Sequence, residues 1–76
     1  MTTLTLADLK INEKAVVLKV NAKTELKQRL ASLGLRRNSN IKIKALSMNK
    51  STIEVEVGTG MLALRFEEAK EIEVKV

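Results

Sequence analysis

The chain of 76 residues contains no histidine and no cysteine. These two residue types provide many of the nucleophiles, general bases and transition-metal ligands of proteins. The acidic residues are scattered, mostly at positions that an alternating strand turns toward solvent. A carboxylate metal site is conceivable only at Glu67, Glu68 and Glu71, where a solvated polar turn is the simpler interpretation. We therefore predict no catalytic residue, no metal site and no cofactor, and we expect that the protein is not an enzyme.

The absence of cysteine also excludes a disulfide, which is typical of proteins in a reducing compartment. No apolar run approaches the length of a membrane span. The first residues lack the basic region and the apolar run of a signal peptide. We expect one domain over residues 1–76 that is soluble and cytoplasmic, and that reaches the inner face of a membrane only through a partner.

Positive charge is concentrated in the first two thirds of the chain. Residues 1–50 carry eleven Lys and Arg against three acidic residues, a net charge of +8, whereas residues 51–76 carry three against six, a net charge of −3. Such a division indicates an acidic partner surface or nucleic acid. The candidate phosphate contacts are Lys23, Lys27, Arg29, Arg36, Arg37, Lys42 and Lys44.

The scarcity of aromatic residues argues against two kinds of partner. Phe66 is the only aromatic residue, and the strand pattern places it in the core. Single-stranded nucleic acids commonly stack their bases on aromatic side chains, and proline-rich peptides dock in aromatic-lined grooves. Cross-strand pairing is also expected to engage Lys42 and Lys44 with Glu54 and Glu56. A small nucleic-acid-binding module is therefore the alternative, and a protein surface is the preferred partner.

Alternating apolar and polar residues dominate the rest of the sequence, as in half-buried strands. They predict five strands, at residues 15–20, 41–45, 53–57, 61–66 and 72–76. Val16, Leu18 and Val20 are expected to share one face of the first strand. Residues 4–9 predict a single helical turn, and residues 67–70 predict a polar turn. Five short strands with one helix after the first indicate a mainly β fold, a small and strongly bent antiparallel barrel.

One segment has the period of an amphipathic helix. Thr24 is a candidate N-cap residue, and Glu25 places negative charge at the positive end of the helix dipole. The apolar face of this helix is expected to consist of Leu26, Leu30 and Leu33.

The end of this helix carries the candidate site. Gly34 can adopt the left-handed conformation that ends the helix after Leu33, and Leu35 can fold back onto the last turn in a Schellman cap. Arg36 and Arg37 follow directly. Two adjacent arginines at a turn offer bidentate donors for carboxylates or phosphates, although solvated charges that complement the helix end are the alternative.

A second candidate contact is apolar. On a strand, either Met61 or Leu62 must point away from the core, and cover by the N-terminal turn is the alternative to a partner contact. The predicted partner-binding residues are Lys27, Arg29, Arg36, Arg37 and Met61.

Taken in order, the motifs of nearly the whole chain resemble the ferrous iron transport protein A (FeoA) family of small cytoplasmic proteins. The segments that carry the resemblance are Leu6-Ala7-Asp8-Leu9, Ala15 to Val20, Leu26 to Leu35, Leu62-Ala63-Leu64-Arg65, Glu68-Ala69 and Ile72-Glu73-Val74. Their order and spacing are specific, although no single motif is diagnostic. The resemblance implies an SH3-like antiparallel barrel of five strands with one helix after the first.

The chain departs from the family pattern at two turns. The family usually has Pro-Gly before the first strand and again after the helix, where this chain has Ile11-Asn12 and Arg37-Asn38. Asparagine tolerates positive φ better than other non-glycine residues, so both turns can form.

The resemblance implies a role in bacterial ferrous iron uptake. It implies a non-enzymatic accessory or regulatory protein that docks on the cytoplasmic G-protein domain of the membrane iron transporter. A less favoured version has Arg36 or Arg37 stimulate nucleotide hydrolysis as an arginine finger. The same barrel occurs as an appended domain of iron-dependent repressors, so the fold alone leaves the role open. Self-association through an edge strand is also left open.

Overall fold

Alternation of apolar and polar residues builds six strands in the part of the chain that the structure, a computed structural model, describes: residues 4–47, 49 and 51–76. The strands are β1 (Leu4–Thr5), β2 (Lys14–Val20), β3 (Asn40–Leu46), β4 (Thr52–Val57), β5 (Gly60–Arg65) and β6 (Ile72–Lys75). The helical elements are the 3-10 turn η1 (Leu6–Asp8) and the helices α1 (Thr24–Ser32) and α2 (Phe66–Ala69).

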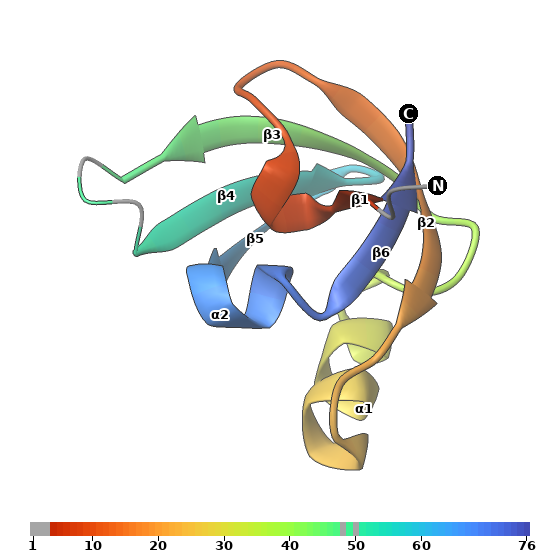
Figure 1. Ribbon diagram of the computed structural model, residues 1–76. Helices are drawn as coiled ribbons and strands as arrows, with labels where there is room; N and C mark the ends of the chain where they lie inside the picture. The colour runs from red at the N-terminus through yellow and green to blue at the C-terminus, as the bar shows by residue number, and fades with distance from the viewer. Residues whose placement is uncertain (1–3, 48, 50) are drawn as a thin grey trace.

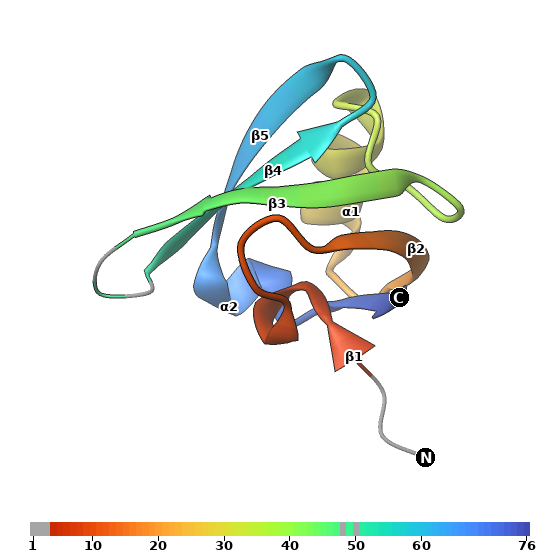
Figure 2. The ribbon, with the colours of Figure 1, turned by 90° about the horizontal axis from the view of Figure 1, so that it is seen from above.

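The six strands form one antiparallel sheet in the order β1-β6-β2-β3-β4-β5. The sheet bends strongly around the core, with η1 and α2 between its two edges and α1 at one end of the barrel (Figure 1). Seen from above, β5 forms one margin of the sheet, and β1 and β6 lie on the opposite side (Figure 2). The predicted mainly β antiparallel architecture, with one helix after the strand that holds Ala15 to Val20, is confirmed.

The core is entirely aliphatic. Its largest fully buried side chains are Leu6, Val17, Leu30, Leu35, Ile43, Ile53, Val55, Leu64 and Ile72. In the described part of the chain no polar or charged residue is buried. Hydrophobic burial therefore holds the barrel together, and the charged residues of the described part are exposed or partly exposed.

The strand count and two element boundaries differ from the prediction. The sixth strand is β1, whose two residues pair with β6 at Leu4↔Val74 and Thr5↔Glu73. A strand of two residues is too short to show an alternation of apolar and polar residues in the sequence. Phe66 begins α2 instead of ending a strand and is only partly buried against the core. The predicted polar turn at residues 67–70 belongs mostly to α2, because Ala69 is fully buried there.

The inner face of β2 was predicted wrongly because the strand contains a bulge. The pairing of β2 with β6 shifts register between Val17 and Lys19. Ala15, Val17 and Val20 consequently point into the core, whereas Leu18 is 43% exposed. A bulge turns consecutive residues to the same side of a sheet, and here it leaves Leu18 and Lys19 both on the surface.

The beginning and the apolar face of α1 also differ from the prediction. Lys23 is the N-cap residue and Thr24 is already helical, with no side-chain capping bond at this end. Leu30 is fully buried and Leu26 is partly buried, but Leu33 is 52% exposed. The helix therefore packs on the barrel mainly through Leu30, with a smaller contribution from Leu26.

The predicted Schellman cap is confirmed. Gly34 has φ +93°, its N–H donates to Ala31 O at 3.0 Å, and the Leu35 N–H donates to Leu30 O at 2.9 Å. Leu35 is fully buried as a result.

Replacing Gly34 by alanine should destabilise the protein through backbone strain alone, because an added Cβ would lie 3.7 Å from Val57 Cγ1, an ordinary contact. A left-handed non-glycine residue costs about 1–2 kcal/mol, so we expect a fall in Tm of roughly 5–15 °C. The matched control is Gly60→Ala, where φ is not in the left-handed region. Equal falls in the two variants, measured by thermal unfolding, would contradict a role for the conformation of Gly34.

Candidate partner-binding site

The loop after α1 is fixed to β2 by a clasp of backbone hydrogen bonds. The Asn38 N–H donates to Val17 O at 2.7 Å, and the Val17 N–H donates to Ser39 O at 2.9 Å. Asn38 has φ +73°, so Asn38 and Ser39 together oppose Val17 in the manner of a G1 bulge with asparagine in place of glycine. The predicted positive-φ asparagine is confirmed.

Ser39 closes the same loop from within. Its Oγ donates to Gly34 O at 2.8 Å and accepts from the Arg36 N–H at 2.9 Å. The Ser39 N–H also donates to Arg36 O at 2.9 Å. Arg36 and Arg37 are therefore carried on a backbone that is bonded on both sides, although both residues are exposed.

A second asparagine turn mirrors the first. Asn12 has φ +74°, its N–H donates to Ile43 O at 2.7 Å, and the Ile43 N–H donates to Glu13 O at 3.0 Å. This turn extends the pairing of β2 with β3 at one end as the Asn38 turn extends it at the other. Both turns form here without proline or glycine.

Between the clasped loop, α1 and β2 lies a groove of about 470 Å³. We call it the basic groove; it is lined by Leu18, Lys19, Val20, Lys27, Ala31, Leu35, Arg36 and Arg37. Its four charged lining residues are all cations, and they come from β2, from α1 and from the loop. Such a site can bind an anionic group, with the arginines offering paired donors and the lysines compact point charges.

The basic groove brings together three of the five predicted partner-binding residues: Lys27, Arg36 and Arg37. Sequence reasoning missed Lys19. The alternation already placed Lys19 on the outer face of its strand, but only the packing of β2 beside α1 and the clasped loop brings it into the groove.

The other two predicted residues lie elsewhere. Arg29 faces α2, where its Nη2 is 3.3 Å from Glu68 Oε2. Glu68 also accepts the Arg65 N–H at 3.0 Å, so this carboxylate ties α1 to the start of α2. Met61 is 58% exposed on β5, opposite Glu56, and does not line the groove.

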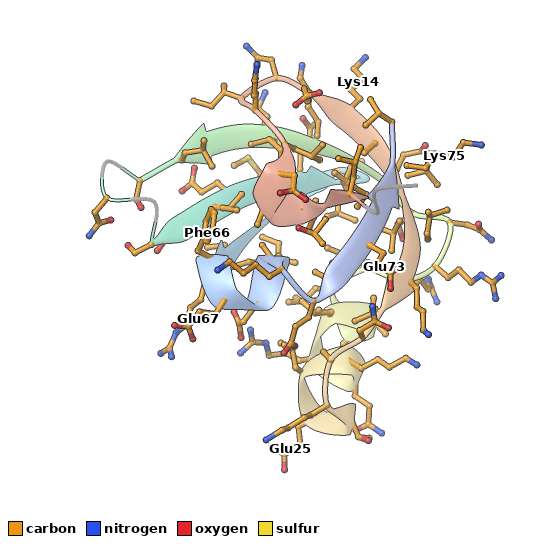
Figure 3. All side chains as sticks on the ribbon, in the orientation of Figure 1. Lys14, Glu25, Phe66, Glu67, Glu73 and Lys75 are labelled. Atoms are coloured by element: carbon orange, nitrogen blue, oxygen red, sulfur yellow. The ribbon has the colours of Figure 1, made fainter. Side chains whose placement is uncertain are left out.

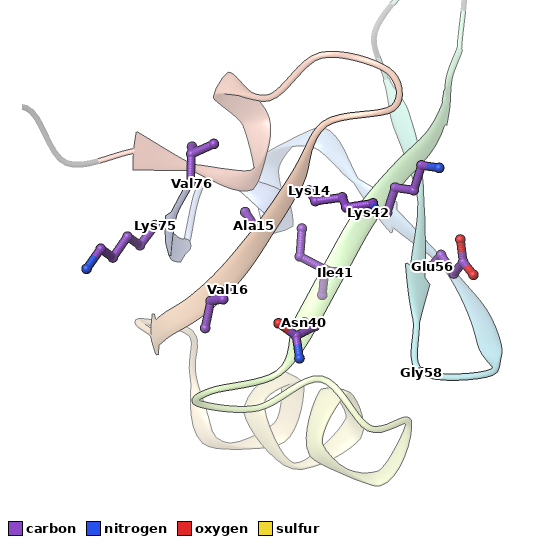
Figure 4. Close-up of a pocket in the computed structure, with 10 residues that line it drawn as sticks. All are labelled: Lys14, Ala15, Val16, Asn40, Ile41, Lys42, Glu56, Gly58, Lys75 and Val76. Atoms are coloured by element: carbon purple, nitrogen blue, oxygen red, sulfur yellow. The ribbon is translucent and has the colours of Figure 1, made fainter.

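A larger hollow of about 580 Å³ lies on another face of the sheet (Figure 4). It is lined by Lys14, Ala15, Val16, Asn40, Ile41, Lys42, Glu56, Gly58, Lys75 and Val76. Lys14 and Lys42 are paired directly across β2 and β3 and reach the same side in Figure 4. This hollow is cationic as well, but it includes a carboxylate and no arginine.

The predicted pairing of lysines and glutamates on β3 and β4 is confirmed in part. Lys44 Nζ lies 3.7 Å from Glu56 Oε2. Glu56 stands opposite Lys42, but a register shift between Ile43 and Ala45 places Glu54 opposite Ala45. The lysine and glutamate rows are therefore offset by one position.

The acidic side chains of α2 are separated from the cationic hollow. In Figure 3, Phe66 and Glu67 lie on the left side of the barrel, and Lys14 and Lys75 lie on the right. Glu67, Glu68 and Glu71 border a smaller recess of about 210 Å³ together with Lys23 and Leu26. Within residues 4–47, 49 and 51–76, no group of three His, Cys, Asp or Glu side chains is placed to hold a metal ion.

The fold is a small SH3-like barrel, and its basic groove is lined by four cations. The FeoA domain family model matches residues 4–76 of the chain. The chain therefore belongs to the FeoA domain family.

Individual relatives agree with this assignment. The chain is 44% identical over 73 residues to the "Putative Fe(2+) transport protein A" of Campylobacter jejuni, a match that covers 96% of this chain and 99% of that protein. The FeoA protein of Chlorobium tepidum shares 32% identity and a TM-score of 0.93, over 96% of this chain and 70% of that one. The FeoA of Stenotrophomonas maltophilia, solved with zinc and described as a prokaryotic SH3 domain protein, shares 30% identity and a TM-score of 0.82, over 95% and 89%.

Substitutions at Asn38 should separate backbone conformation from side-chain chemistry. Alanine at φ +73° is expected to cost about 1 kcal/mol, whereas glycine adopts this φ without strain and should leave stability unchanged or higher. The free energy of unfolding of Asn38→Ala and Asn38→Gly in urea measures the difference. If the glycine variant is as unstable as the alanine variant, the asparagine side chain itself holds the loop.

Proposed function

We propose that this chain is a non-enzymatic accessory protein of bacterial ferrous iron uptake that docks on the cytoplasmic G-protein domain of the membrane iron transporter. Membership of the FeoA domain family supports the connection to iron uptake. The name of the Campylobacter jejuni relative refers to Fe(2+) transport, and a role as a ferrous iron transport activating factor has been suggested for the Stenotrophomonas maltophilia protein.

The observation that carries the docking mode is the basic groove. Four cations from three elements surround it, and two of them are arginines on a clasped loop. Because the backbone of this loop is already held by hydrogen bonds, less conformational entropy is lost when the arginines bind a partner, which favours specific binding. The chain has no helix in its described part that is long and apolar enough to cross a membrane, so membrane association in this proposal comes through the transporter.

A non-enzymatic role is consistent with the residues on this surface. The groove contains lysines, arginines and aliphatic side chains, and the sequence contains no histidine or cysteine. The groove has no hydroxyl or thiol side chain that a neighbouring base could activate as a nucleophile. A more specific form of this docking would have Arg36 or Arg37 contact the transporter's nucleotide as an arginine finger and stimulate its hydrolysis.

Removing both loop arginines should abolish docking without unfolding the barrel. The double variant Arg36→Ala, Arg37→Ala changes two exposed side chains whose backbone bonds remain, so we expect an unchanged Tm and a loss of transporter-dependent ferrous iron uptake in cells. Lys10→Ala, Lys75→Ala is the matched control, since it removes the same charge from exposed positions outside the groove. Unchanged uptake in the arginine variant would remove these residues from the docking surface.

Nucleic-acid binding is the competing function, because a cationic groove also attracts phosphates. The only aromatic residue, Phe66, lies on α2, with Lys70 Nζ 5.5 Å from the centroid of its ring, so it offers the groove no stacking surface. We expect no measurable affinity for single- or double-stranded DNA or RNA at 150 mM salt. Tight binding at that salt concentration, in an anisotropy titration with labelled oligonucleotides, would favour the repressor-type alternative.

A further inference from the structure

The basic groove combines two kinds of surface. Its lining combines four cations with aliphatic side chains: Leu35 and Val20 are buried, Ala31 is partly buried, and Leu18 is 43% exposed. Leucines on β-strands usually point into the core, whereas Leu18 follows the inward-pointing Val17 and lines the groove from the surface. Exposed apolar surface beside the cations is typical of a site for a larger partner and is not required to bind a single ion.

None of the four cations of the basic groove forms an ion pair in the described part of the chain, and Glu73, which stands opposite Lys19 on β6, accepts a hydrogen bond from Asn21 Nδ2. Within the described part of the chain the ion pairs are Arg29 with Glu68 and Lys44 with Glu56, and neither involves a residue of the groove. Four like charges around one hollow repel each other, and an anionic occupant relieves that repulsion. The acidic residues of α2 do not line the groove: Glu67 and Glu68 border the separate recess beside Lys23 and Leu26, and Glu68 is engaged by Arg29.

The size of the groove distinguishes among anionic occupants. A volume of about 470 Å³ lies in the range of sites that bury a multi-atom ligand, well above the size of one carboxylate or phosphate group. A nucleic-acid backbone would satisfy the cations but would bring no apolar group to the side chain of Leu18. A peptide with carboxylates on both sides of an apolar side chain can pair with the cations and also cover the aliphatic side chains of the groove.

We propose that the basic groove receives an acidic segment of the transporter's G-protein domain, in which an aliphatic or aromatic residue flanked by Asp or Glu packs on Leu18 and Ala31. This inference rests on the proposed docking and adds the chemistry of the partner. Arg36 and Arg37 bind the carboxylates of that segment through paired donors, and Lys19 and Lys27 supply charge from the opposite side of the groove.

The test is binding of the purified chain to the purified cytoplasmic G-protein domain, measured by calorimetry at several salt concentrations. The double reversal Lys19→Glu, Arg37→Glu is expected to weaken binding by at least about 30-fold and to flatten its salt dependence. The control Lys10→Glu, Lys75→Glu has the same net charge, and we expect a change of no more than about threefold through long-range steering. Equal losses in both variants would show that overall charge and not the groove determines binding.

The apolar part of the proposal has its own pair of variants. Leu18→Ser should weaken binding roughly five- to tenfold, as expected for a half-exposed leucine that becomes buried, and should leave the salt dependence unchanged. Ile11→Ser is the control, because Ile11 is similarly exposed but lies outside the groove. Thermal unfolding of each variant shows whether the barrel is intact. Parental affinity of an intact Leu18→Ser variant would contradict a buried apolar residue.

The outcomes separate this inference from the proposed function. If the parent chain binds the domain but the groove variants bind equally well, docking stands and the acidic-segment proposal is wrong. If the parent chain does not bind the domain at all, both are wrong. If the control variant Lys10→Glu, Lys75→Glu loses binding and the groove variants do not, the site lies at the hollow that Lys75 lines, and the inference is wrong.

Discussion

Two backbone clasps join β2 and β3, and the position of the basic groove depends on one of them. The regular ladder between these strands covers only Lys14–Val16 with Asn40–Lys42. The turns at Asn12 and Asn38 extend it at its two ends. In each turn the asparagine N–H donates to the carbonyl of a buried strand residue, Ile43 or Val17, and the N–H of that residue donates to the carbonyl of the residue after the asparagine. Without the Asn38 clasp the loop after α1 would lose its attachment to Val17. The arginines would then no longer face Lys19 across a fixed distance.

The groove is a consequence of irregularities in a regular fold. A strand without a bulge would bury one of Leu18 and Lys19 and expose the other. The register shift on β2 exposes both, and the Schellman cap of α1 directs the chain back over them. Both irregularities are also tied to the core, because the cap buries Leu35 and the bulge turns Val17 and Val20 inward.

The sequence predicted the elements that follow from local chemistry. Alternation located β2 to β6, and the glycine after three leucines located the end of α1. Asparagine was identified as the substitute for glycine at both departures from the family pattern, and φ is positive at Asn12 and Asn38. These features depend on residues close together in the chain, where propensity and sterics decide the conformation.

The missed features depend on contacts between distant residues. The bulge at Val17 arises from pairing with β6, and β1 exists only because Leu4 meets Val74. Leu33 has the spacing of a core residue, but it is 52% exposed, whereas Leu30 on the same helix is fully buried. Likewise, Lys19 could not be assigned to the groove from sequence, and Arg29 could not be recognised as a residue that binds Glu68.

The central claim is that this SH3-like barrel recognises its partner through the end of its helix and the bulged strand beside it. Amide chemical-shift mapping of the ¹⁵N-labelled chain, titrated with the unlabelled G-protein domain, tests it most directly. The predicted result is a contiguous set of perturbed amides around Leu18, Lys19, Lys27, Ala31 and the Arg36-Arg37 loop, with little change on α2. Perturbations confined to Met61 and β5, or to the hollow around Lys14 and Lys42, would contradict it.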